Sequence, residues 1–246
     1  MFPLVVGRVA SLPEPDSFFT HDATGIPFLV TRDPWGTPHA FVNLCRHRGA
    51  RLVYEERGRE ARFACRHHGW TYDTCGRMTN VALSKCDAEQ MRRESSLVSM
   101  KCAARHGFVW LGRGPFRDDW DLAADLGETD AVLGALGLDA AEVISEESGE
   151  LPEDWKRVVE RMLDEPSVLV FPSSIVRVAG DVLEHVAVFP KGVDAAAAGG
   201  TRGSSYVLTT RLGGADASAL ATVTRTSSEA FHDRIERALA AHPRRF

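Results

Sequence analysis

Four side chains in the first third of this 246-residue chain have the types and the spacing to hold an iron–sulfur cluster. Cys45 and His47 form a C-x-H pair, and after 17 intervening residues Cys65 and His68 form a C-x-x-H pair. Two cysteine thiolates on one iron and two histidine imidazoles on the other are the ligand set of a Rieske [2Fe–2S] centre. Such a centre carries one electron at a time, so the motif predicts electron transfer and leaves the substrate open.

A glycine follows each Cys–His pair, Gly49 in the first loop and Gly69 in the second. We expect a tight turn at both positions, and a close approach to the cluster that a Cβ atom would hinder. His47 and His68 should lie at the loop tips, where their second ring nitrogens reach solvent or an electron partner.

A structural zinc site is the alternative, since two cysteines and two histidines can close a tetrahedron. Zinc modules usually pair C-x2-4-C with H-x3-5-H. Here each half mixes one cysteine with one histidine, and Gly-Trp follows the second pair. The pattern therefore favours the Rieske cluster.

The chain resembles the α-subunits of Rieske non-haem iron oxygenases, the ring-hydroxylating oxygenases. Four stretches carry the resemblance: Asn43–Ala50, Cys65–Asp73 with Gly76, Gly107–Leu111 and Asp154–Lys156. Neither loop has the extra cysteine of respiratory Rieske proteins, and His67 replaces a residue that is more often aromatic. The resemblance implies an α+β fold, with an all-β Rieske domain at 1–113 followed by a shortened helix-grip domain, an antiparallel sheet plus a helix, at 114–246.

Periodicity in the first half indicates short strands, and in the second half a helix with strands around it. We expect strands at 28–31, 40–43, 62–65 and 108–111, with turns at Asp33–Gly36 and Arg57–Gly58. An acidic, helix-prone segment covers 118–142, and an apolar stripe predicts a helix over Pro152–Asp164. Further strands are expected at 174–179, 182–189, 206–212 and 219–226, a hairpin loop at 194–203 and helical spacing at 228–241.

The catalytic iron site of the family is not visible in this sequence. In the family, the first helix of the second domain carries D-x2-H-x4-H, and a distant carboxylate completes a 2-His-1-carboxylate site. The resemblance places the motif's aspartate at Asp164 and the two ligand positions at Ser167 and Pro172, which cannot replace imidazole. Asp164 is then either a remnant of the bridge between one subunit's cluster and its neighbour's iron, or a helix-end acid. We expect no mononuclear Fe(II).

Other residues offer an alternative route to an iron site. His185, with Glu184, falls on an expected strand that would face the helix carrying Asp164 and Glu165, and His232 with Asp233 falls near the chain's end. A lone histidine in a strand is more often a packed or surface residue. Ser167 and Ser173 lack an evident His–Asp partner, so the sequence does not support nucleophilic hydrolysis.

Charge and composition limit the classes of partner. The net charge of −5 combines +5 in residues 1–113 with −10 in residues 114–246. A basic cluster domain suggests docking to an acidic electron carrier or to another subunit, although a solvated basic face would look the same. The arginines that crowd the cluster loops are Arg46, Arg48, Arg51, Arg66 and Arg77. No basic stripe with interleaved aromatic residues indicates a nucleic acid partner.

Cysteine use and hydropathy favour the cytoplasm. The apolar run at the start ends at Arg8, too short for a signal peptide, and no segment approaches the ~20 apolar residues of a membrane helix. Besides the two predicted cluster ligands, the chain has three further cysteines, Cys75, Cys86 and Cys102, which are expected to be free thiols in a reducing compartment. Cys75 has a second interpretation, a tuning or redox-sensitive position near the cluster.

Three function hypotheses follow. The first is an oxidoreductase that keeps the cluster and passes electrons without its own mononuclear iron. The second is an active oxygenase that hydroxylates or demethylates a small organic substrate at an unconventional or partner-supplied iron. The third is a non-enzymatic cluster-bearing sensor or degenerate subunit. The first two imply a ferredoxin or a flavin/NAD(P)H reductase as electron donor, and the resemblance implies a homotrimer or a partner oxygenase subunit.

Overall fold

The computed structural model describes residues 3–22, 25–80, 95–112, 120–163, 167–170, 172–193 and 203–216, with residues 218, 220, 231, 233, 236 and 237. The chain divides into two compact units, one that extends to Leu122 and one that begins at Ala123. The boundary predicted between residues 113 and 114 falls in a stretch outside the described residues, so it stays a prediction.

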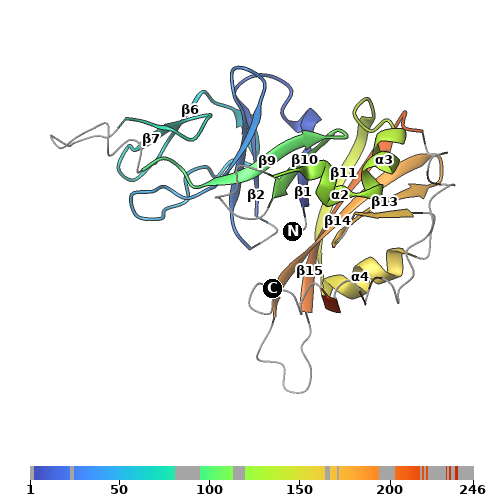
Figure 1. Ribbon diagram of the computed structural model, residues 1–246. Coiled ribbons are helices and arrows are strands. Elements are labelled where there is room, and N and C mark those ends of the chain that lie inside the picture. The colour runs from blue at the N-terminus through green and yellow to red at the C-terminus, as the bar shows by residue number, and fades with distance from the viewer. Residues whose placement is uncertain are drawn as a thin grey trace. The chain divides into compact units, whose positions relative to one another are not determined.

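In the part that the structure describes, the first unit holds ten antiparallel strands, several of which are labelled in Figure 1. Seven strands form one sheet in the order β1-β10-β9-β4-β3-β2-β5. Their bounds are Leu4–Arg8 (β1), Ser17–His21 (β2), Phe28–Arg32 (β3), Pro38–Val42 (β4), Arg57–Arg59 (β5), Ser99–Arg105 (β9) and Phe108–Gly112 (β10), and a 3-10 turn covers Val9–Ser11. A second sheet holds β6 (Arg62–Ala64), β7 (Thr71–Asp73) and β8 (Met78–Asn80). The strands expected at 28–31, 40–43, 62–65 and 108–111 are confirmed as β3, β4, β6 and β10.

Two hairpins of this unit use the same four-residue turn. Asp33 and Gly36 bound the turn between β3 and β4, and Asp73 and Gly76 bound the turn between β7 and β8. In each, one aspartate oxygen accepts the backbone N–H groups two and four residues later, at 2.8–3.0 Å. Each glycine has a positive φ, +93° and +73°, which favours glycine. The turn predicted at Asp33–Gly36 is therefore confirmed.

The turn predicted at Arg57–Gly58 is wrong, because both residues lie in β5 and pair with β2. The Phe18 ring occupies the space where a Cβ on Gly58 would project, at 2.9 Å. This glycine serves a close packing contact inside a strand and not a reversal of the chain.

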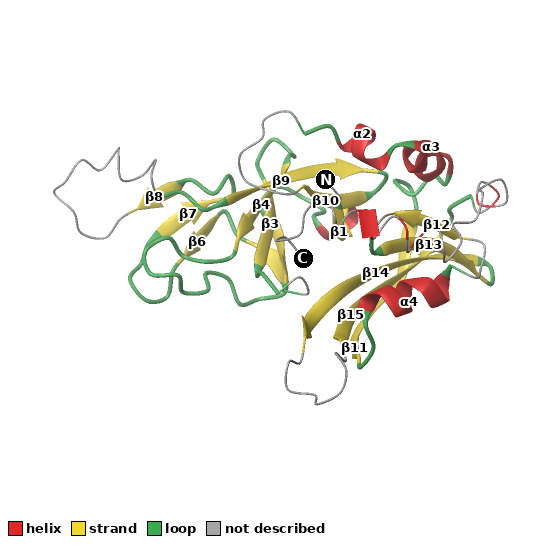
Figure 2. Cartoon of the chain, turned by 60° about the horizontal axis from the view of Figure 1, so that its bottom comes forward, coloured by secondary structure: helices red, strands yellow, loops and turns green. Residues whose placement is uncertain are grey.

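The second unit is a five-stranded antiparallel sheet with a helix on one face (Figure 2). The strand order is β11-β15-β14-β13-β12, with bounds Glu142–Leu151 (β11), Ser167–Val170 (β12), Ser174–Ala179 (β13), Val182–Val193 (β14) and Gly203–Gly213 (β15). Helix α4 (Trp155–Met162) contacts β13, β14 and β15. An antiparallel sheet plus helix after an all-β unit is the α+β architecture that the sequence predicted.

Helix α4 is held to the sheet by an apolar stripe. Val158 and Val159 are fully buried and pack with Ile175, Val186 and Val188 of the sheet. Burying each such side chain contributes about 1.5–3 kcal/mol. The helix starts later than predicted, because the carboxylate of Asp154 accepts the Lys156 N–H at 2.9 Å and serves as N-cap. Pro152 therefore precedes the helix.

The segment expected to be helix-prone at 118–142 forms two short helices, α2 (Leu122–Leu126) and α3 (Glu128–Ala135), separated by Gly127 with φ +56°. Its five apolar positions are all buried: Leu122, Leu126, Leu133, Leu136 and Leu138. The end of this segment enters β11, a strand that the sequence did not predict.

The sequence did predict features that the structure does not describe. The loop at 194–203 and the strand at 219–226 lie almost wholly outside the described residues, as do Cys86 and most of 228–241. Among the described residues, no helix has the length and apolar character needed to span a bilayer.

Candidate iron–sulfur cluster site

The two loops that carry the Cys–His pairs share one backbone hydrogen-bond pattern. The first loop follows β4, and the second joins β6 to β7. In each loop the cysteine N–H, from Cys45 or Cys65, donates to the carbonyl five residues later. The N–H of the glycine, Gly49 or Gly69, donates back to the cysteine carbonyl, and all four distances lie between 2.7 and 2.9 Å. The loops are thus two copies of the same structural unit.

The two loop glycines adopt left-handed backbone conformations, with φ +72° at Gly49 and +70° at Gly69. A Cβ at either position would meet no protein atom within 4 Å. The expected tight turn is present. The left-handed backbone conformation, and not a steric clash with neighbouring protein atoms, is the reason for glycine at these positions.

The two histidines face each other through their Nδ1 atoms. These atoms of His47 and His68 are 3.2 Å apart, and the rings are nearly perpendicular at 88°. The Trp70 ring stacks on His47 with centroids 4.8 Å apart and so fixes its orientation. Desolvation, the neighbouring His68 ring and the Arg48 guanidinium lower the pKa of His47. Two imidazoles whose Nδ1 atoms converge in this way are suited to binding one metal ion together.

The two cysteines lie deeper, with only 2% of Cys45 and 3% of Cys65 exposed. The Tyr72 hydroxyl is 3.4 Å from the Cys45 sulfur, and its oxygen accepts the Arg46 N–H at 3.1 Å. Either group can donate while Cys45 is a thiol, but a Cys45 thiolate can only accept from the Tyr72 hydroxyl. Burial raises the pKa of the Cys45 thiol, hydrogen bonds from Tyr72 and the His47 amide oppose this, and the adjacent Cys65 adds to it. A thiol of this kind becomes a thiolate when a metal replaces its proton.

A buried asparagine closes the base of the first loop. The Asn43 side chain accepts the Val53 N–H at 2.9 Å and donates to the Val53 carbonyl at 2.7 Å. These two bonds imitate a strand pair, so the chain segments on either side of Cys45 and His47 are held together.

The four predicted ligands line one cavity of about 230 Å³, together with Arg48, Ala50 and His67. No three of the four donor atoms lie within 4.8 Å of one another, so the arrangement does not suit a single zinc ion. It divides instead into a buried thiol pair and a more exposed imidazole pair. This division fits a [2Fe–2S] cluster with thiolates on the inner iron and imidazoles on the outer one.

Charged side chains surround the cavity, and part of their charge is compensated. Arg51 pairs with Asp22, and Arg66 pairs with Glu55, each at 2.6 Å. Both guanidinium groups also lie over the ring of Tyr54. Four of the five predicted steering arginines are exposed, namely Arg46, Arg48, Arg66 and Arg77, and the first three are next to predicted ligands in the sequence.

Comparison with known proteins agrees with this geometry. Residues 2–100 match the Rieske [2Fe-2S] domain family. The glycine betaine monooxygenase oxygenase subunit of Pseudomonas aeruginosa (strain UCBPP-PA14) is 31% identical over 159 residues, which are 64% of this chain and 36% of that protein. The chlorobenzene dioxygenase subunit alpha of Cupriavidus sp. (strain PS12) is 29% identical over 167 residues, which are again 64% of this chain and 36% of that protein. Residues 2–100 therefore form a Rieske [2Fe–2S] domain, and 64% of the chain is similar in sequence to oxygenase subunits.

Solved structures extend the fold comparison beyond the Rieske domain. The apo form of the quaternary ammonium Rieske monooxygenase CntA aligns with 98% of this chain and 73% of its own, at a TM-score of 0.71 and 16% identity. A naphthalene 1,2-dioxygenase aligns with 97% of this chain and 69% of its own, at a TM-score of 0.68 and 15% identity. At these identities the likeness concerns the fold. The chain spans 36% of the length of each curated relative named above.

The second unit separates the two positions at which the resemblance placed the iron ligands. Ser167 begins β12, and Pro172 lies in the turn beyond the end of that strand. A strand advances roughly 3.3 Å per residue, so these positions are spread along the sheet and not gathered on one helix face. Asp164 and Glu165 lie outside the described residues.

The expected alternative pair, His185 and Glu184, does not face the helix as a pair. Val186 packs against α4, and alternation along β14 places His185 on the opposite face of the sheet, where it is 2% exposed. The expected strand does contact the helix, but His185 itself lies on the other face of the sheet.

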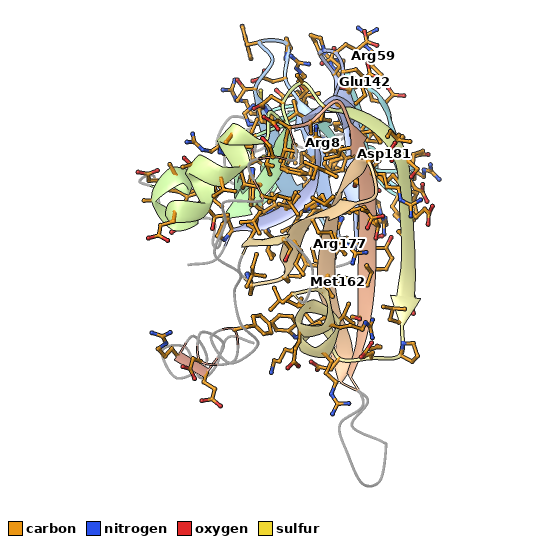
Figure 3. All side chains as sticks on the ribbon, turned by 90° about the vertical axis from the view of Figure 1, so that its right-hand side faces the viewer. Arg8, Arg59, Glu142, Met162, Arg177 and Asp181 are labelled. Atoms are coloured by element: carbon orange, nitrogen blue, oxygen red, sulfur yellow. The ribbon has the colours of Figure 1, made fainter. Side chains whose placement is uncertain are left out.

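Glu184 does lie on the helix-bearing face, but two arginine side chains already bind its carboxylate. It accepts hydrogen bonds from Arg177 at 2.9 Å and from Arg211 at 2.8 Å. Burial raises the pKa of Glu184, and the two guanidinium bonds more than offset this, so the net pKa is lowered. Figure 3 labels Arg177 on the sheet and Met162 at the end of α4. His232 lies outside the described residues, and Asp233 is exposed.

Three residues near the cluster have roles that the motif alone did not reveal. Tyr72 is hydrogen-bonded to the sulfur of Cys45, Trp70 stacks on the ring of His47, and Asn43 closes the first loop. All three lie within the stretches that resemble the family. Their positions marked them as significant, but their contacts depend on how the two loops pack.

Proposed function

We propose that Cys45, His47, Cys65 and His68 bind a Rieske [2Fe–2S] cluster and that the protein is an oxidoreductase that passes electrons through it. The observation that carries the proposal is the pair of histidine Nδ1 atoms, 3.2 Å apart, in one cavity with two buried cysteines. When bound, the cluster supplies one-electron transfer. The chain buries the sulfurs, directs the Tyr72 proton at one of them, and keeps His68 open to solvent.

In this proposal the chain binds no mononuclear iron of its own. Two features support it: Ser167 and Pro172 at the aligned ligand positions lie apart on a strand and a turn, and two arginines hold Glu184. Asp164, which lies outside the described residues, would then be a remnant of the inter-subunit bridge or an acid without a role in catalysis.

The proposed electron donor is a ferredoxin or a flavin/NAD(P)H reductase with an acidic docking face. The exposed Arg46 and Arg48 beside the histidines favour such a partner, because opposite charge speeds encounter. We place the protein in a homotrimer or beside a partner oxygenase subunit, since relatives such as that of Pseudomonas aeruginosa are themselves subunits. The free thiols of Cys75 and Cys102 suit a reducing cytoplasm.

The first experiment is anaerobic purification followed by iron and acid-labile sulfide analysis and EPR of the dithionite-reduced protein. Two irons, two sulfides and a Rieske signal per chain are expected. Zinc in place of iron, or a cluster signal of four-cysteine type, would contradict the proposal.

Variants then test the ligand assignment. Cys65→Ser and His68→Ala should abolish the Rieske signal, because each removes one of four ligands. His67→Ala and Cys102→Ala are matched controls, an adjacent histidine and a cysteine elsewhere in the same unit, and both should keep the signal. A normal spectrum in either ligand variant would show that the assignment is wrong.

An oxygenase reaction on a small organic substrate is the second candidate, and the relatives named as monooxygenase and dioxygenase subunits favour it. It requires an iron at an unconventional site or from a partner. A reproducible third iron per chain that reacts with nitric oxide would select this function over the first.

A further inference from the structure

A second group of metal-binding side chains lies in the first unit, away from the cluster cavity. One ligand atom each from Asp33, His39 and Cys75 lies within 4.8 Å of the other two. It is the single group of three such side chains within that distance in the part of the chain that the structure describes. None of the three lines the cluster cavity.

Two hairpins bring these residues together. Asp33 begins the turn between β3 and β4, His39 lies in β4, and Cys75 occupies the turn between β7 and β8. The Thr31 hydroxyl donates to the Thr74 carbonyl at 2.6 Å and ties the second turn to β3.

The second turn is also held by packing and by its own aspartate. Gly76 lies so close to the Phe41 ring that a Cβ would clash with it. The Cys75 N–H donates to the Asp73 carboxylate at 3.0 Å. The relative positions of the three side chains are therefore fixed by buried contacts and not by exposed loops.

The donor atoms of Asp33 and His39 already converge. One oxygen of Asp33 accepts two backbone N–H groups, from Trp35 and Thr37, which leaves the second oxygen 2.9 Å from the His39 Nε2. The Asp33 side chain is only 6% exposed, whereas 31% of the His39 side chain is exposed and Cys75 is half-buried. An ion can thus reach from solvent a carboxylate that is itself fixed in the protein.

We propose that Asp33, His39 and Cys75 bind one divalent transition-metal ion of the zinc class, with water in the fourth position. Zinc accepts carboxylate oxygen, imidazole nitrogen and thiolate sulfur together. Metal–ligand bonds of about 2.0 Å in a tetrahedron set the carboxylate oxygen and ring nitrogen about 3.3 Å apart, close to the 2.9 Å observed.

The charge and the protons of the proposed binding step can be accounted for in full. The metal replaces the Cys75 thiol proton, which passes to solvent. It also displaces the proton that His39 Nε2 shares with Asp33, and the ring takes up one proton at Nδ1 in exchange. The two positive charges of the ion meet one carboxylate and one thiolate. One proton is therefore released for each ion bound.

A Cys–His–Asp nucleophilic triad is the competing interpretation of the same residues. The His39 Nε2 is already engaged by Asp33. Burial and the nearby Asp73 and Asp33 carboxylates raise the pKa of the Cys75 thiol, so no base activates it. A Cys75 thiolate alone would be repelled by these carboxylates, and a bound metal cation would offset that repulsion.

The ion would join the β3–β4 hairpin to the hairpin that carries Tyr72. Strand β7 is three residues long and runs from the second cluster loop to the Cys75 turn. Metal binding therefore stiffens the element that supplies a hydrogen bond to the cluster.

The test uses protein that already contains two irons and two sulfides, treated with a mild chelator and then titrated with Co²⁺ or Zn²⁺. One equivalent should bind, with a thiolate-to-cobalt charge-transfer band, and calorimetry in buffers of different ionisation enthalpy should report one proton released. The Rieske EPR signal should persist. Loss of that signal on metal uptake would overturn the proposal, because the ion would then occupy the cluster site.

Variants give the decisive comparison. Cys75→Ser should remove the charge-transfer band and weaken binding at least about 100-fold, since even changes behind the ligands cost 10–100-fold. His39→Gln should weaken binding similarly, and it provides an independent test if Cys75→Ser does not fold. Cys102→Ala is the matched control and should bind like the parent. Equal affinity in Cys75→Ser and the parent, or no uptake by the parent, would refute the site.

Discussion

Replacing Tyr72 with phenylalanine should lower the reduction potential of the cluster. The Tyr72 hydroxyl donates to the Cys45 sulfur at 3.4 Å, and a donor to a ligand sulfur favours the reduced state, which holds more negative charge. The ring is fully buried, so phenylalanine fills the same space and removes only the oxygen.

The size of the effect follows from the hydrogen bond. A net contribution of about 1–1.5 kcal/mol in favour of the reduced state is typical of such a bond. For a one-electron couple, a factor of ten in the equilibrium constant corresponds to 59 mV, and the potential should therefore fall by about 40–60 mV. The backbone N–H of His47 also approaches the Cys45 sulfur, so the cluster itself should remain.

The assay is an EPR-monitored redox titration of the parent, Tyr72→Phe and Tyr54→Phe. Tyr54 is a half-exposed tyrosine that stacks with arginines and makes no bond to sulfur, so its variant should keep the parental potential. A Tyr72→Phe potential equal to or above the parent's, at full iron content, would refute the proposed direction of the hydrogen bond.

Three further predictions concern stability. Burial lowers the pKa of His21 from 6.5 to about 4, so below pH 6.5 the unfolded chain takes up a proton that the native chain does not, and native stability falls by about 3 kcal/mol by pH 4. His21→Gln should reduce this acid loss in urea unfolding at pH 7 and 4.5; an unchanged loss would contradict the assignment. Glu184→Gln should cost about 1–3 kcal/mol at pH 7, because it weakens two charged hydrogen bonds. The native pKa of Glu184 is lowered, so its contribution is present above the unfolded pKa and is lost as the pH falls through the native one. The gap between variant and parent should close as the pH falls through the lowered native pKa of Glu184, and a gap that persists in acid would argue against an ionic origin. Gly76→Ala should cost about 2–4 kcal/mol, since it combines a positive φ with a clash against Phe41, whereas the control Gly25→Ala has a positive φ and open space and should cost about 1 kcal/mol. Equal melting temperatures for the two glycine variants would refute the packing argument.

The cluster loops could be predicted from the sequence because ligand chemistry is local. Cysteine and histidine in alternating pairs restrict the cofactor, and each pair lies within four residues, so no long-range packing has to be known. The strands around them were also predictable where apolar residues and turn residues alternate, as in Phe28–Arg32 and the Asp33 turn.

Features that depend on tertiary contacts could not be predicted in this way. The face on which His185 lies depends on which side of β14 packs against α4, and the sequence of one strand does not contain that information. Strand β11 escaped prediction because it pairs with β15 through its backbone while its side chains, mostly polar, face solvent. The group of Asp33, His39 and Cys75 forms only when two hairpins distant in sequence meet.

Strand β11 has a consequence for the protein's behaviour in concentrated solution. It is an edge strand of ten residues, with Val143 and Ile144 42% and 58% exposed, and an open edge of that length can recruit another chain. Four glutamates line it: Glu142, Glu146, Glu147 and Glu150. A second copy aligned along the same edge would set carboxylate against carboxylate, and this repulsion disfavours such pairing. Replacing these glutamates with glutamine should therefore favour edge-to-edge aggregation.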